Sequence, residues 1–80
     1  MEMNKEELLD KLRRAFEMEE VMAGTLTALI QAQALAIDIP EAQRRRIHEV
    51  LSTIHQDTLR HKQIVSGMMK SVSGGPHGAT

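Results

Sequence analysis

A single break near the middle of the chain constrains the fold most strongly. The residues Asp38-Ile39-Pro40-Glu41 separate two apolar series that each recur every three to four residues, as on one face of an α-helix. Helical geometry is disfavoured for the residue before a proline, whereas the proline itself fits the start of a new helix. The pattern therefore predicts a helix over about 5–36, a turn over about 37–40 and a second helix over about 41–71.

Both predicted helices begin with residues typical of helix starts. Asn4 is followed three residues later by Glu7, which is the form of an N-cap residue with a reciprocating acid. Asp38 and Glu41 repeat this spacing at the break. We therefore expect side chains to cap both helices.

Two helices of similar length joined by a few residues must lie antiparallel. The expected fold is thus all-α, an antiparallel two-helix hairpin that occupies residues 1–72. Residues 73–80 are rich in glycine and poor in apolar side chains, so we expect a disordered tail. Because 80 residues bury too little surface for a comfortably stable core, we expect two hairpins to dimerise into a four-helix bundle.

The expected core is aliphatic, because Phe16 is the only aromatic residue. The uncharged segment 21–37 contains polar residues and is shorter than the roughly 20 apolar residues of a membrane span, so we interpret it as a helix covered by protein. The apolar positions are Leu8, Leu12, Phe16, Ala23, Leu26, Ile30 and Ile37 in the first helix, and Ile47, Val50, Leu51, Ile54, Val65, Met68, Met69 and Val72 in the second.

Composition excludes several classes of function. The chain has no cysteine, which rules out disulfides, thiolate zinc sites and a cysteine nucleophile. A net charge of -1 with interspersed acids and bases, and no aromatic pair for base stacking, argues against nucleic acid as a partner. We interpret Arg44-Arg45-Arg46 as a solvated helix face. With no recognisable signal peptide, we expect a cytoplasmic protein that does not bind membranes.

One acid and one histidine interrupt the apolar stripes. At about 100° per residue, Glu19 lies at the centre of the first stripe, whereas Glu20 falls at its flank. On the second helix, with Ile54 taken as the centre, His61 and Thr58 fall inside the stripe and Asp57 at its edge. The other two histidines, His48 and His55, fall about 100° or more away and are expected at the surface.

Glu19 and His61 are also expected to lie at the same depth. In a hairpin that turns near Pro40, residues whose numbers sum to about 80 share a layer, so these two side chains should meet in the interior. A buried carboxylate costs several kcal/mol unless it is paired, protonated or bound to a cation. A two-fold dimer would bring together two carboxylates and two imidazoles, a donor set suited to iron, manganese or zinc. The alternative is a Glu19–His61 hydrogen bond that fixes the register without a metal.

Two segments resemble the ferritin-like superfamily, in particular its rubrerythrin-related and encapsulated-ferritin-like members. The segment Ala15-Phe16-Glu17-Met18-Glu19 is similar to the one that carries the family's first glutamate. The segment Ile54-His55-Gln56-Asp57-Thr58-Leu59-Arg60-His61 is similar to the one that ends in the histidine of the Glu-x-x-His motif. The resemblance implies a helical hairpin that pairs with another and holds iron through Glu19 and His61.

The chain departs from this family at Thr58, which stands where the motif has its glutamate. Asp57 is adjacent and is a less certain substitute as a ligand, while Thr58 is left as a residue that orients the ligands. The resemblance implies a homo-oligomeric metal-binding protein with a possible ferroxidase-like oxidation of Fe(II) or a role in iron handling. The competing hypothesis is a non-catalytic hairpin that dimerises or serves as an adaptor, with Glu19 and His61 as a structural pair.

Overall fold

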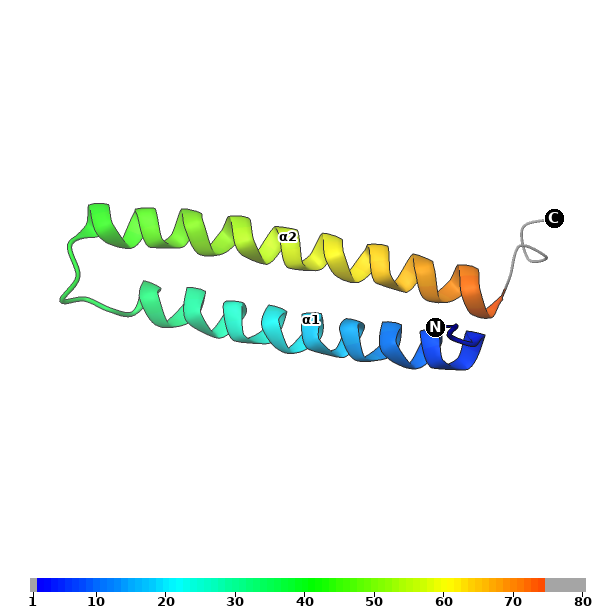
Figure 1. The fold of residues 1–80 in the computed structure, drawn as a ribbon. Coiled ribbons are helices and arrows are strands. Elements are labelled where there is room, and N and C mark those ends of the chain that lie inside the picture. Colours follow the sequence, from blue (N-terminus) through cyan, green and yellow to red (C-terminus); the bar gives the residue numbers. More distant parts are fainter. Residues whose placement is uncertain (1, 75–80) are drawn as a thin grey trace.

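The chain folds into two long antiparallel helices (Figure 1). The computed structural model describes residues 2–74. Helix α1 spans Lys5–Ala34 and helix α2 spans Glu41–Ser73, and residues 35–40 connect them at one end of the rod. The predicted all-α hairpin is confirmed, and it measures 54 × 27 × 18 Å along its principal axes.

All four helix ends agree with the prediction within about two residues, but only one of the two predicted caps is present. At the start of α1, Glu7 N donates to Asn4 Oδ1 over 2.8 Å and Asn4 N donates to Glu7 Oε1 over 3.1 Å, so the predicted cap is confirmed. Both helices end within about two residues of their predicted ends. The second cap was predicted wrongly, because Pro40 is the N-cap residue of α2 and no side chain hydrogen-bonds there. The predicted tail begins one residue too early, since Ser73 is still helical, and its residues 75–80 lie outside the described part.

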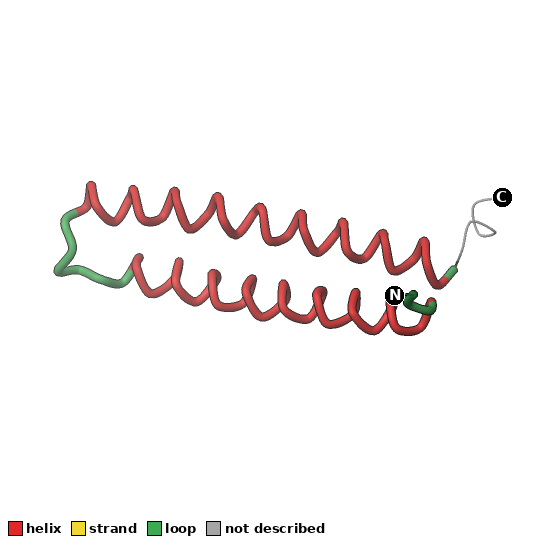
Figure 2. The backbone as a smooth tube through the Cα atoms, in the orientation of Figure 1, coloured by secondary structure: helices red, strands yellow, loops and turns green. Residues whose placement is uncertain are grey.

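The connection between the helices is the loop at the closed end of the hairpin (Figure 2), and Arg44 stabilises it. Its Nε donates to Ile39 O over 3.1 Å and its Nη1 to Ala34 O over 3.5 Å. The bond to Ala34 satisfies a carbonyl group that the end of α1 leaves without a helical partner, and the bond to Ile39 ties the loop to α2. Arg44 is therefore half-buried rather than solvated, in contrast to the expectation for the arginine cluster.

The helices pack along a seam whose positions alternate in steps of three and four residues, the spacing of coiled-coil helices. Its most enclosed residues are Leu26 and Thr58, each 4% exposed, and Ala23, 8% exposed. The Thr58 hydroxyl is satisfied within its own helix, where it donates to Ile54 O over 3.0 Å. The seam positions are Leu9, Leu12, Phe16, Glu19, Ala23, Leu26, Ile30 and Gln33 on α1, and Leu51, His55, Thr58, Lys62, Val65, Met69 and Val72 on α2.

A second apolar stripe of α2 lies outside the seam. Two of its residues, Val50 and Ile64, are 50% and 53% exposed. The large apolar residues of this stripe follow the same three-to-four spacing as the seam. Each of them comes one residue before a seam position or its heptad equivalent. The apolar spacing of the sequence does not separate the two stripes, so their residues were predicted to form a single buried stripe. Together with exposed residues on the same side of α1, this stripe forms what we call the apolar face: Leu8, Met18, Met22 and Leu29 of α1, and Ile47, Val50, Ile54, Ile64 and Met68 of α2.

Neither helix in residues 2–74 is apolar enough over a sufficient length to cross a membrane.

Candidate functional site

Glu19 and His61 meet across the hairpin, as their layer matching predicts. The Oε2 atom of Glu19 lies 3.7 Å from the Nδ1 atom of His61. The side chains are 30% and 52% exposed, respectively, so the pair lies at the edge of the seam and is not enclosed in the single hairpin. The physical reason is which side of α2 faces α1. His61 lies on the second apolar stripe of α2, outside the seam, whereas the sequence pattern predicts that it lies on the buried stripe.

The neighbouring acid points to the other side of the seam. Successive helical residues diverge by about 100°, so Glu19 and Glu20 flank the seam on opposite sides. Glu20 Oε2 lies 3.8 Å from Lys62 Nζ, and this ammonium group lies 5.3 Å from the centroid of the Phe16 ring. We call the side of the seam that carries the Glu20–Lys62 contact the polar side. Glu20 and Lys62 thus form an ion pair at the flank where the sequence places Glu20.

Asp57 lies one helical turn before His61 on the outer stripe of α2. Residues four apart on a helix share a face, so Asp57 and His61 project to the same side. The carboxylate of Asp57 accepts a hydrogen bond from Arg60 Nη2 over 3.1 Å, and its side chain is 53% exposed. The structure therefore places Asp57 beside His61 along the stripe, more centrally than the sequence analysis assumed.

Thr58 does not orient His61. It is a seam residue whose hydroxyl proton is donated to Ile54 O. Its short side chain lets α1 approach closely at the layer where the family motif has a glutamate. That Thr58 positions metal ligands therefore stays a prediction, and in the single hairpin its hydroxyl bonds its own helix.

Both histidines that were expected at the surface contact α1; His48 is exposed, as expected, whereas His55 is half-buried. Thr27 Oγ1 donates to Ala23 O over 3.0 Å, so it must accept the bond from His55 Nε2 over 3.1 Å, which places a hydrogen on that nitrogen. His48 Nδ1 lies 3.2 Å from Gln33 Nε2, an amide nitrogen that can only donate. The seven-residue spacing of His55, Lys62 and Met69 is the sequence signal that would have shown the place of His55 along the seam.

The single chain supplies few ligands at any one point. Within residues 2–74, no three groups among His, Asp and Glu are close enough to hold one metal ion together. The Glu19–His61 contact uses one carboxylate oxygen and one ring nitrogen, which leaves a second donor atom, Oε1 or Nε2, on each residue. A complete metal site at this pair therefore needs ligands from outside residues 2–74 of the single chain.

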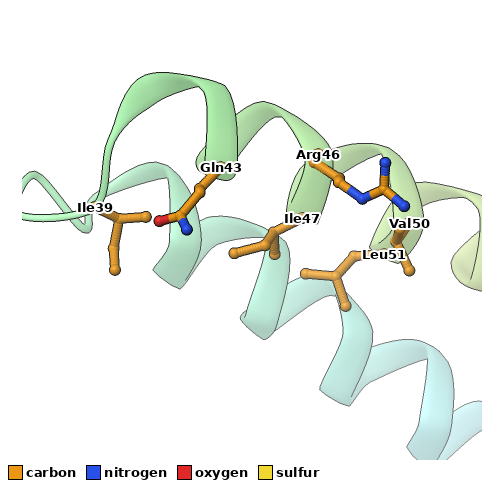
Figure 3. Close-up of a pocket in the computed structure, with 6 residues that line it drawn as sticks. All are labelled: Ile39, Gln43, Arg46, Ile47, Val50 and Leu51. Carbon is orange, nitrogen blue, oxygen red and sulfur yellow. The ribbon is translucent and has the colours of Figure 1, made fainter.

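The apolar face is hollowed on both helices. Near the connection, a groove of about 420 Å³ is lined by Ile39, Ile47 and Leu51 together with neighbouring residues of α2 (Figure 3). On α1, a second groove of about 570 Å³ is lined in part by Met18 and Met22. The face thus has depressions that side chains of another molecule can enter.

Comparison of the chain with family models, curated proteins and solved structures gave no match. The resemblance to the ferritin-like superfamily consequently rests on the placement of Glu19 and His61 in the hairpin and on the two short segments that contain them.

Proposed function

We propose that two copies of the chain associate through the apolar face to form a four-helix bundle that binds a metal ion. The observation that carries this proposal is the position of the Glu19–His61 pair on that face. Large exposed apolar side chains lie on both sides of it along the rod, from Ile54 and Leu29 toward the connection to Ile64 and Leu8 toward the open end. Contiguous apolar surface of this kind marks an interaction site.

A second copy is the occupant that fits this face. The pair lies near the middle of the face, so rotation of a second hairpin by 180° about an axis through this layer sets apolar residues against apolar residues. The same rotation sets Glu19 and His61 of one copy against those of the other. A small domain with so few enclosed side chains also gains much of its stability from such an association.

The two-fold bundle would hold a metal through two Glu19 carboxylates and two His61 imidazoles. Oxygen and imidazole donors suit iron, manganese or zinc. Asp57, one turn before His61, would add a carboxylate from each copy. Iron is our preferred ion because of the ferritin-like resemblance, and oxidation of Fe(II) or iron handling is the corresponding activity.

A metal-free role is the competing candidate, and one observation favours it. The Glu19 Oε2 atom and the His61 Nδ1 atom approach within 3.7 Å, so the two side chains can pair directly with each other. In that case the chain is a structural or adaptor hairpin, and the pair sets the register of the bundle, as buried polar residues do in coiled coils.

Metal analysis of the purified protein, followed by titration with Fe(II) under anaerobic conditions, tests the metal site. We expect stoichiometric binding that is lost in Glu19→Ala and in His61→Ala. Glu20→Ala and His55→Ala are matched controls, since each removes the same kind of group from a contact outside the proposed site. A wild-type dimer that carries no metal and does not respond to iron, manganese or zinc would overturn the metal proposal and leave the structural one.

The double substitution Glu19→Leu with His61→Leu separates the two roles further. If the pair only sets register, apolar replacements of similar size leave the stability of the dimer unchanged or raise it. If the pair holds a metal, the double variant loses the stabilisation that added metal confers on the wild type. Thermal unfolding with and without metal measures the difference.

A further inference from the structure

The sulfur atoms of this chain are unevenly distributed. It has six methionines and no cysteine, so thioethers are its only sulfur groups. Three of them belong to the apolar face: Met18 is 72% exposed, Met22 is 49% exposed and Met68 is 43% exposed. Met69, by contrast, is a seam residue.

These three methionines surround the Glu19–His61 layer. Met22 lies one turn after Glu19, and Met18 precedes Met22 by four residues and lines the same groove. Met68 follows His61 by seven residues, which places it two turns away on the same stripe of α2. Oxidation at these positions would therefore alter the centre of the face and one of its flanks.

We infer that oxidation of Met18, Met22 and Met68 to sulfoxides switches off association of the hairpins, an inference that rests on the proposed dimer. The oxidant is a hydroperoxide such as hydrogen peroxide. One peroxide oxygen forms a bond to the thioether sulfur while the O–O bond breaks, and its proton passes to the other oxygen, which leaves as water. The sulfur loses two electrons and the peroxide gains them. The product is a polar sulfoxide in place of a flexible apolar side chain.

The switch acts on association and leaves the hairpin folded. None of the three side chains belongs to the seam, and their exposure makes them accessible to peroxide whenever the copies separate. In the dimer, however, a sulfoxide oxygen would be buried against apolar side chains without a hydrogen-bond donor. With six such groups in a dimer, we expect the dissociation constant to rise by at least about 100-fold.

The test treats the purified protein with hydrogen peroxide and follows three quantities. Peptide mass spectrometry locates the added oxygen atoms, sedimentation measures association, and circular dichroism measures helix content. We expect the oxidised wild type to dissociate with its helix content retained, and methionine sulfoxide reductases to restore the dimer. The combined variant Met18→Leu, Met22→Leu and Met68→Leu should stay associated in peroxide. Met3→Leu is the matched control, because Met3 is 48% exposed but outside the face, and this variant should respond like the wild type.

The possible results distinguish failure of this inference from failure of the proposed dimer. A wild type that is monomeric before oxidation contradicts the proposed dimer. A dimer that persists after all three methionines are oxidised overturns the inference and leaves the dimer in place. Dissociation that reductases do not reverse, or that occurs equally in the triple leucine variant, also overturns it. If the leucine variant does not associate even without peroxide, the reductase experiment on the wild type decides the matter.

Discussion

The two sides of the seam differ in chemistry although the same two helices form them. On one side, Glu20 pairs with Lys62, and Thr27 accepts a hydrogen bond from His55, so polar groups find partners within the chain. On the other side, the Glu19–His61 pair is surrounded by large apolar residues that have no cover within residues 2–74. The hairpin thus satisfies the polar groups on one side with partners from its own chain, whereas the large apolar side chains on the other side stay exposed unless a partner covers them.

A charge placed on each side in turn tests this difference most strongly. Ile54→Asp puts a carboxylate into the apolar face, and the proposed dimer would then bury two of them. Since an unpaired buried charge costs about 3 kcal/mol or more, we expect the dissociation constant to rise by at least about 100-fold. Sedimentation equilibrium measures it.

Gln63→Asp is the matched control, because Gln63 is an exposed residue of the same helix on the polar side. Its dissociation constant should change less than about threefold, since a solvated charge away from the interface contributes little. Equal effects of the two substitutions would show that the apolar face is not the contact surface.

A change in the seam should affect both sides alike. Leu26→Ala removes the most enclosed large side chain of α1 and leaves a cavity, so we expect the free energy of unfolding to fall by about 3 kcal/mol. Urea denaturation at a fixed protein concentration measures this loss. Leu35→Ala, at a side chain that is 78% exposed, should cost less than about 0.5 kcal/mol. Comparable losses at both positions would contradict the assigned seam.

A smaller effect is expected at the helix starts, which belong to neither side. Asn4→Ala removes the cap of α1 and should lower the free energy of unfolding by about 1 kcal/mol. Asp38→Ala should have almost no effect, because α2 begins at Glu41 without a side-chain cap. The same denaturation measurements compare the two, and a larger loss in Asp38→Ala would show that the cap lies where the sequence predicted it.

The smallest effect is expected on the polar side. Glu20→Gln breaks the contact with Lys62, in which the glutamate side chain is 52% exposed. Exposed ion pairs contribute less than about 1 kcal/mol, so we expect a loss of about 0.5 kcal/mol or less that vanishes at high salt. A salt-independent loss of several kcal/mol would mean that the polar side also holds the molecule together.

The fold could be predicted from the sequence because its signals are local. Pro40 places the break, the apolar period identifies the helices, and equal arms force the antiparallel arrangement. Layer matching then brings Glu19 to His61 without any knowledge of side-chain packing. The prediction that failed was which residues of α2 face α1. The apolar residues of α2 occupy a broad arc of the helix that covers both stripes, so they do not identify the buried one.

The seam of α2 was hidden because several of its members are polar. His55 hydrogen-bonds Thr27, Thr58 hydrogen-bonds its own helix, and Lys62 extends past the Phe16 ring, so each is compatible with a seam position. The partners of His55 and Lys62 belong to the other helix, and a count of apolar residues along one helix does not detect any of these contacts. The burial of His61 was overestimated for the same reason.

Sedimentation equilibrium of the unmodified chain at micromolar concentrations is the most direct test of the proposed dimer, because the proposed metal site at Glu19 and His61 requires a second copy. We predict a species of twice the 9.0 kDa chain mass, or a larger assembly built from such dimers. A single species of 9.0 kDa throughout this range would contradict the account.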